Sequence, residues 1–305
     1  MTRITDYDFY PTDDGFLGIA PDEAPPPEDA RAVIVPFGLE ASVSYGGGTA
    51  KGPEAIIKAS HEVELFDEDL WCEPYRKIGV ATMDAPLIAS GVASALDQIE
   101  AITEDLLAAG KFPLVLGGEH SVTAGVIRPF ARRFDELAVL HFDAHADLRD
   151  GYEGEHFSHA SAIRRALDFE NINVVSVGIR NISAGEIPFL EENGERVRIH
   201  WAKDRATYDA EAIAAELGDR PVFITVDLDG FDSSLMPATG TPEPGGLFWQ
   251  DVIDIIKATA KTHRIVGADV MELAPIDGWH ACDFLAAKLA YKILGHAFQD
   301  KGVDS

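Results

Sequence analysis

The sequence predicts an α/β fold with a central, mostly parallel β-sheet, and three observations lead to this prediction. Short apolar runs alternate along the chain with amphipathic, helix-like segments. The apolar runs are continuously hydrophobic, as strands covered on both faces must be. The chain has 305 residues, 46% of them hydrophobic, which is enough for a large core. Together these features favour helices packed on both faces of one sheet.

The first 31 residues are expected to form an irregular arm outside this pattern. Residues 1–31 contain eight acidic residues, two basic residues and five prolines, and they show no sustained apolar periodicity. From residue 32 onward no glycine- and serine-rich linker or abrupt change in composition interrupts the alternation. We therefore predict a single continuous domain over residues 32–305.

Seven apolar runs are the predicted strands. In chain order they begin at Ala32, Phe112, Leu137, Ile172, Val197, Pro221 and Arg264. Between them, apolar side chains recur at spacings of three and four within residues 96–106, 252–260 and 284–293. This spacing predicts amphipathic helices whose apolar faces pack on the sheet.

The charge balance is strongly acidic, because 25 basic residues stand against 52 acidic residues and give 25 − 52 = −27. This charge argues against binding of nucleic acid through its phosphates. The acidic excess has three possible origins: a solvated surface that maintains solubility, adaptation to a salt-rich host, or a field that attracts a cationic substrate.

Neither a membrane segment nor a secretion signal is expected. The apolar runs are much shorter than the roughly 20 residues that span a bilayer. The N-terminal segment lacks a basic start followed by an apolar stretch, so a cytoplasmic location is expected. Cys72 and Cys282 form no metal-binding or redox motif and are expected to be buried free thiols.

Polar residues with chemical potential follow directly after four of the predicted strands. They are GGEHS at residues 117–121, DAHAD at 143–147, DLDGFD at 227–232, and Glu272. In a parallel sheet the carboxyl ends of the strands lie along one edge, where ligands bind. Five of the ten histidines also lie within residues 120–159. Four separated segments are therefore predicted to form one site.

Two of these motifs place acidic residues at alternate positions. In an extended segment Asp143, His145 and Asp147 would point to the same side, and the DLDGFD motif repeats this pattern. Four aspartates in one crevice cannot all stay ionised without compensating cations. An oxygen-rich set of this size predicts two divalent cations and favours manganese over zinc. The six candidate ligands are His120, Asp143, His145, Asp147, Asp227 and Asp229.

Three further polar residues near these motifs have structural interpretations. His141 lies deeper in its strand and is interpreted as a core or supporting histidine. His156 is interpreted as a loop histidine, and Asp232 as a turn residue rather than a ligand.

The motifs GGEHSVT, HFDAHADLRD, SHASAIRRA, VDLDGFD, PATGTPEPGGL and MELAP, in this order, resemble the ureohydrolases, the arginase and agmatinase family. They look most like its agmatinase branch, and the resemblance extends over roughly residues 32–298. It implies a three-layer arginase/deacetylase-type α/β fold, two Mn²⁺ ions per subunit and a homo-oligomer, either a trimer or a hexamer.

The resemblance also implies roles for individual residues. His159 corresponds to the family's proton shuttle, and Glu272 corresponds to the glutamate that holds the guanidinium group. A water between the two cations is expected to lose a proton near neutral pH, and Asp147 is expected to orient the resulting hydroxide and take its remaining proton. Ala160 stands where glycine is common, and Ser233 where proline is common. The short segment 148–158 lacks the residues that recognise the amino-acid head of arginine, which disfavours arginine as the substrate.

The predicted function is manganese-dependent hydrolysis of a small cationic guanidino compound to urea and an amine, with agmatine giving putrescine and urea. A guanidino acid such as guanidinobutyrate is the main alternative, and a metal-dependent deacetylase or a catalytically silent binding subunit is less consistent with six ligands. Charges in the loop before His159 and directly after it point both ways. Asp150, Glu153 and Glu155 would favour a distant ammonium, whereas Arg149, Arg164 and Arg165 would favour a carboxylate.

Overall fold

A computed structural model of the protein describes residues 4–299 and contains an eight-stranded sheet in which all strand pairs are parallel. The strand order is β2-β1-β3-β8-β7-β4-β5-β6. The strands are β1 (Ala32–Phe37), β2 (Val80–Thr82), β3 (Phe112–Gly117), β4 (Leu137–Phe142), β5 (Ile172–Ile179), β6 (Val197–Trp201), β7 (Val222–Asp227) and β8 (Ile265–Met271). All seven predicted strands are confirmed. The edge strand β2 was not predicted, because three residues are too short for a periodicity signal.

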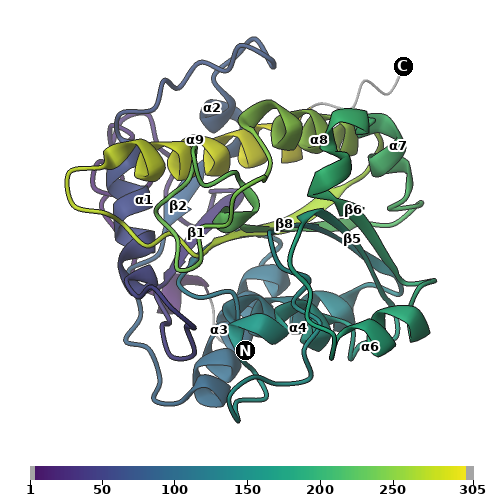
Figure 1. Ribbon diagram of the computed structural model, residues 1–305. Coiled ribbons are helices and arrows are strands. Elements are labelled where there is room, and N and C mark those ends of the chain that lie inside the picture. Colours follow the sequence, from purple (N-terminus) through teal and green to yellow (C-terminus); the bar gives the residue numbers. More distant parts are fainter. Residues whose placement is uncertain (1–3, 300–305) are drawn as a thin grey trace.

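Helices cover both faces of this sheet, which confirms the three-layer α/β fold (Figure 1). One layer contains α1, α8 and α9, and the opposite layer contains α3 and α4. The α-helices are α1 (Gly52–Ser60), α2 (Pro74–Ile78), α3 (Val92–Ala108), α4 (Val122–Arg133), α5 (Ala162–Ala166), α6 (Ile187–Glu192), α7 (Ala210–Ala215), α8 (Trp249–Thr262) and α9 (His280–Ala297). The 3₁₀ helices are η1 (Ile4–Asp6), η2 (Thr49–Lys51), η3 (His159–Ser161), η4 (Ala202–Thr207) and η5 (Leu228–Gly230).

Strand β1 shows why the strands are hydrophobic without alternation. Ala32 and Ile34 enter the core beneath α1 and α9, whereas Val33 and Val35 enter the core beneath α3 and α4. Because successive side chains point to opposite faces, a sheet covered on both faces needs apolar residues at every position. None of the helices within residues 4–299 is long and apolar enough to cross a membrane.

The segment before β1 is irregular but well packed. Residues 7–31 run through turns, and Phe9 forms an isolated bridge with Met83. Phe16, Leu17 and Ile19 are buried in the same core as α1. Residues 1–3 of the predicted arm and residues 300–305 of the predicted domain lie outside the described residues.

A buried lysine fastens the segment after α1 to α9. The Lys292 ammonium lies 3.0 Å from Asp67, 3.0 Å from Glu68 and 2.9 Å from Asp69. The side chains of Lys292 and Asp67 are each 1% exposed. Lys257 of α8 also contacts Asp69. Removing this ammonium would leave a buried carboxylate without its main partner.

We expect Lys292→Met to destabilise the protein by about 3 to 5 kcal/mol, because it keeps the apolar volume but leaves the buried Asp67 carboxylate without a cationic partner. The measurement is the urea unfolding midpoint at neutral pH. Lys261→Met is the control, since Lys261 pairs with Glu211 at 3.5 Å and both side chains are exposed. Equal shifts in the two variants would show that the buried cluster contributes no special stability.

Candidate metal centre and substrate cavity

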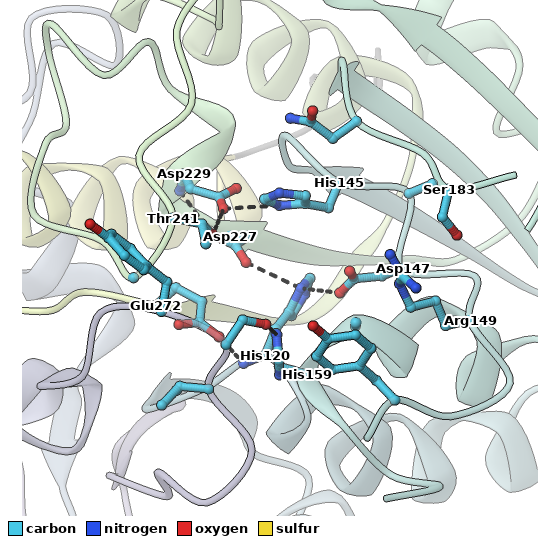
Figure 2. Close-up of a pocket in the computed structure, with 18 of the residues that line it drawn as sticks. His120, His145, Asp147, Arg149, His159, Ser183, Asp227, Asp229, Thr241 and Glu272 are labelled. Carbon is cyan, nitrogen blue, oxygen red and sulfur yellow. Dashed lines mark hydrogen bonds and ion pairs between the residues drawn. The ribbon is translucent and has the colours of Figure 1, made fainter. Parts of the chain in front are cut away.

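The candidate site is a cavity of about 320 Å³ at the carboxyl ends of β3, β4, β7 and β8 (Figure 2). Seven of the eight predicted site residues line it, and the eighth, Asp143, lies behind them and is fully buried. The seven are His120, His145, Asp147, His159, Asp227, Asp229 and Glu272. The predicted meeting of four chain segments at one edge of the sheet is confirmed.

His120 lies at the centre of the carboxylates. Its Nδ1 atom is 3.0 Å from Asp147, 3.2 Å from Asp143 and 3.4 Å from Asp227, and its side chain is 1% exposed. Figure 2 shows His120 between Asp147 and Asp227. Despite this crowding, Nδ1 makes no hydrogen bond of acceptable geometry. An orphaned nitrogen surrounded by three carboxylate oxygens is the arrangement that a shared cation would satisfy.

A second group of ligand atoms adjoins the first. The Nδ1 atom of His145 lies 3.1 Å from Asp229 and 3.6 Å from Asp143. Asp143 therefore faces both histidines and can contribute one carboxylate oxygen to each group. This arrangement fits two adjacent divalent cations that share a carboxylate.

The backbone places these side chains differently from the prediction. The prediction that Asp143, His145 and Asp147 share one side because they alternate along an extended strand is wrong, since β4 ends at Phe142, before the DAHAD motif begins. Instead, the Ala144 N–H donates to the Asp229 carboxylate at 3.1 Å, and His145 forms a parallel bridge with Asn181. Asp147 then adopts a left-handed backbone conformation with φ 51°. Contacts with neighbouring loops therefore direct this motif.

Close backbone packing supports the site at two points. A Cβ atom on Gly230 would lie 2.8 Å from the Asp143 nitrogen, so this glycine lets η5 approach the DAHAD loop. A Cβ atom on Gly118 would lie 1.9 Å from the Leu39 carbonyl oxygen. Gly118 also accepts a hydrogen bond from the Glu272 N–H at 2.8 Å. Glu272 itself has φ 68°, an uncommon value for a residue with a side chain.

The charges of the cluster work against one another. Burial, followed by repulsion from Asp229 and Asp143, raises the pKa of Asp227 well above its usual value. Burial also raises the pKa of Glu272 to about 8. Burial alone would lower the pKa of His145, but Asp229 and Asp143 raise it to about 12. The protein therefore holds more negative charge here than its own cations balance, as expected of a site for metal ions.

Residues behind the ligands orient His120. Its Nε2 atom lies 3.0 Å from the Thr225 hydroxyl, and the Thr123 hydroxyl donates to Asp269 at 2.9 Å. Asp269 is fully buried, and burial raises its pKa to about 6. We did not identify Thr225 or Asp269 from the sequence. Thr225 precedes Asp227 by two positions on one strand, so the period of two could have indicated that both face the site.

The structural interpretations of three residues fit their surroundings. His141 is buried and its ring contacts Asp143 at 2.8 Å and Ser176 at 2.9 Å, so it supports a candidate ligand. His156 contacts Arg165. Asp232 accepts hydrogen bonds from the backbone of Gly245 and Gly246 and holds a turn.

The far wall of the cavity contains residues that the sequence analysis missed. Asn181, Ser183 and Glu186 line it, and Glu186 accepts hydrogen bonds from the Ser183 N–H at 2.7 Å and hydroxyl at 2.6 Å. They follow the carboxyl end of β5. Because ligands bind at the carboxyl ends of parallel strands, their position in the sequence could have indicated that they lie near the site. Of the six charged loop residues considered, Arg149 lines the cavity.

The three acidic residues of this loop do not line the cavity, although they would have to do so to bind a distant ammonium group of the substrate. Asp150, Glu153 and Glu155 are absent from its lining, and Asp150 pairs with Arg165 at 2.8 Å. Arg165 also pairs with Asp168 at 3.0 Å and is buried, so this arginine is not available to a substrate carboxylate. Asp150 and Arg165 are therefore paired with each other rather than directed at the cavity.

The two predicted site residues that are not candidate metal ligands border the cavity. The His159 ring contacts the Ser44 hydroxyl through Nε2 at 2.7 Å and the Ser42 hydroxyl through Nδ1 at 3.3 Å. The Glu272 carboxylate accepts a hydrogen bond from the backbone N–H of His120 at 2.7 Å. A carboxylate and an imidazole thus border the same space as the acidic cluster.

Comparison with known proteins identifies the class of enzyme that this fold and site define. The arginase family profile matches residues 30–295. The chain therefore belongs to the arginase family and is a ureohydrolase, so the resemblance stated from the motifs is confirmed.

Several relatives share most of the chain. An N(1)-aminopropylagmatine ureohydrolase from Synechocystis is 38% identical, covering 88% of this chain and 89% of the relative. An agmatinase from Bacillus anthracis is 36% identical, covering 82% and 85%. Among solved structures, the agmatine ureohydrolase of Thermoplasma volcanium is 29% identical with a TM-score of 0.81, covering 90% and 92%. Proclavaminate amidino hydrolase from Streptomyces clavuligerus is 27% identical with a TM-score of 0.84, covering 93% and 96%.

We expect Asp227→Asn to make the metal-free protein at least as stable as the wild type at pH 7. The raised pKa of Asp227 means that its ionised form opposes folding, so stability is lost as pH rises through that pKa. A neutral amide removes this loss. The measurement is the melting temperature of chelator-treated protein.

Asp232→Asn is the matched control for this experiment. Hydrogen bonds from Ser234 and nearby backbone N–H groups lower the pKa of Asp232 to about 2, so its ionised form favours folding at neutral pH. This control is expected to melt at a lower temperature than the wild type. A large destabilisation by Asp227→Asn would contradict the charge-repulsion argument.

Proposed function

We propose that the protein hydrolyses the guanidino group of a small cationic amine to urea and an amine, with manganese as its metal. Agmatine, which would give putrescine and urea, is the favoured substrate. The observation that carries this proposal is the cluster of buried carboxylates around Nδ1 of His120, beside Glu272 and His159 in one cavity. This arrangement combines ligands for cations, an acceptor for a guanidinium group and a proton-transfer group.

The donor set suits two manganese ions. The ligands would be His120, Asp143, His145, Asp147, Asp227 and Asp229. Four carboxylates favour Mn²⁺, and the orphaned Nδ1 of His120 would gain a partner. When bound, paired divalent cations act as a Lewis acid and make water nucleophilic near neutral pH.

The remaining steps belong to residues of this chain. Glu272 would bind the guanidinium group by charge-assisted hydrogen bonds, and the arriving cation would favour the ionised carboxylate despite its raised pKa. Asp147 would orient the attacking water and accept its proton as the carbon–oxygen bond forms. His159 would donate a proton to the amine nitrogen as the carbon–nitrogen bond breaks. The hydroxyl proton that remains on the new carbon–oxygen group passes to the departing amine, so the products are urea and an ammonium ion.

A second candidate substrate differs from agmatine at the end away from the guanidino group. Relatives that cover most of the chain are named agmatinase or N(1)-aminopropylagmatine ureohydrolase, and both names describe cationic amines. The net charge of −27 also favours a cation over guanidinobutyrate. Arg149 on the cavity wall is the feature that favours guanidinobutyrate. Because both names describe cationic amines, we place N(1)-aminopropylagmatine second to agmatine as the substrate.

For the assembly, we propose a trimer or a hexamer.

We expect His159→Ala to lower turnover by roughly 10²- to 10⁴-fold, as is usual for loss of a general acid or base. Metal content should stay near that of the wild type, because His159 contacts Ser42 and Ser44 rather than the carboxylate cluster. Asp227→Ala is the contrasting variant and should lose metal together with activity. Metal analysis and urea release are measured on the same samples. Equal metal loss in both variants would remove His159 from proton transfer.

The substrate is identified by kcat/KM for agmatine, N(1)-aminopropylagmatine, guanidinobutyrate and arginine at low and high salt. We expect the two polyamine-like cations to be preferred, and their advantage to shrink as salt screens the field of the protein. Substitution of zinc or magnesium for manganese should lower the rate. A preference for guanidinobutyrate would contradict the proposed substrate class, whereas activity with none of the four would contradict the proposed reaction.

A further inference from the structure

We propose that Glu119 and Ser42 are positioning residues that keep the neutral His159 ring protonated on Nδ1, with the Nε2 lone pair directed at the cavity. The structural part of this inference depends on hydrogen bonds alone. Its meaning for catalysis rests on the proposed function of His159.

Glu119 is a buried carboxylate that acts as an anchor for the loop containing Ser42. It is 0% exposed although it adjoins the candidate metal centre. One oxygen accepts hydrogen bonds from the backbone N–H groups of Ala41 at 2.5 Å and Ser42 at 2.6 Å. The other accepts from the hydroxyls of Ser42 at 2.7 Å and Ser121 at 2.6 Å. Four donors converge on it, so the Ser42 hydroxyl proton is directed at Glu119.

Counting protons at Ser42 then determines the tautomer of His159. A serine hydroxyl has one proton and two lone pairs. Since the proton goes to Glu119, the oxygen can only accept from its other neighbours. These are the backbone N–H of His159 at 2.9 Å and the ring Nδ1 at 3.3 Å. Nδ1 must therefore carry a proton, because two lone pairs facing each other would repel.

The opposite edge of the ring faces the cavity. Nε2 lies 2.7 Å from the Ser44 hydroxyl, and Ser44 lines the cavity whereas Ser42 does not. The Tyr152 ring packs edge-on against the imidazole at 5.9 Å between centroids and restricts its rotation. With Nδ1 protonated, Nε2 carries the lone pair and accepts a hydrogen bond from the Ser44 hydroxyl. The ring can then take up a proton at Nε2 and release it to a leaving amine in the cavity.

The chain of contacts therefore runs from Glu119 through Ser42 to His159. The Glu119 carboxylate does not line the substrate cavity. Its effect is to orient a hydroxyl dipole, which in turn selects one of two tautomers of a ring with the same shape. A change that reverses the hydroxyl should reverse the tautomer without moving the loop.

Glu119→Gln is that change. The backbone N–H groups of Ala41 and Ser42 require the amide oxygen on their side, which places the amide NH₂ toward the hydroxyls of Ser42 and Ser121. The amide would then donate to Ser42, and the Ser42 proton would turn toward Nδ1 of His159. We expect the ring proton to move from Nδ1 to Nε2.

The tautomer is read from imidazole ¹⁵N shifts and two-bond ¹H–¹⁵N couplings in full-length, ¹⁵N-histidine-labelled protein. Chelator-treated samples avoid paramagnetic broadening, and a pH of about 8.5 keeps an ordinary imidazole neutral. His159→Gln assigns the signal by its disappearance. Wild type should show the Nδ1–H form and Glu119→Gln the Nε2–H form.

Three further variants keep the test decisive. Ser121→Ala removes the other hydroxyl on the same Glu119 oxygen and should leave the Nδ1–H form in place. Ser42→Ala removes the hydroxyl that accepts from Nδ1 and should lose the Nδ1–H form of His159, which tests the proposal even if Glu119→Gln fails to fold. Ser42→Thr retains a hydroxyl and should keep the Nδ1–H form. An Nε2–H form in the wild type, or an unchanged tautomer in both Glu119→Gln and Ser42→Ala, would overturn the proposal.

Kinetics separate this inference from the proposed function. With manganese present, Glu119→Gln should lower kcat at least tenfold while KM and metal content stay near wild type, because the substrate and metal contacts are retained. Full activity in Glu119→Gln despite a reversed tautomer would overturn the catalytic part of the inference. Full activity in His159→Ala would instead remove the proposed role of His159 and leave the tautomer result standing.

Discussion

The structure of this site depends on one electrostatic constraint: four aspartates must be kept close together in a place that excludes most water. Asp143, Asp147 and Asp227 lie within 3.4 Å of one histidine nitrogen, and burial combined with mutual repulsion raises the pKa of Asp147 and Asp227. Such a cluster opposes folding unless cations are added. The fold must supply enough apolar burial to hold it, and the two cores of the three-layer architecture do so.

The parallel sheet makes this concentration of charge possible. Because all eight strands run in one direction, the polar ends of β3, β4, β7 and β8 lie at one edge while their apolar stretches fill both cores. The site then requires backbone conformations that strands do not provide. Asp147 and Glu272 both have positive φ angles, and Gly118 and Gly230 allow contacts too close for a side chain.

Several charged residues around the site hold loops in place. Asp150 pairs with Arg165, Glu186 accepts hydrogen bonds from Ser183, and Glu119 holds the segment that carries Ser42. This explains why the sign of a loop residue in the sequence is a poor guide to the substrate. The groups that could act on a guanidino group converge on one cavity, and Arg149 is the charged residue of the loop before His159 that lines it.

The sequence by itself determined the parallel sheet, seven of its eight strands and seven of the polar residues that line the cavity. These follow from local patterns: continuous hydrophobicity, and acidic or histidine motifs directly after strands. Only the tertiary structure decided how Asp143, His145 and Asp147 are aimed, because β4 ends before them and distant backbone groups direct them. It also decided the roles of Glu119, Thr225 and Asp269. Their partners lie 77, 105 and 146 positions away in the chain, and hydrogen bonds across such separations leave no periodic signal in the sequence.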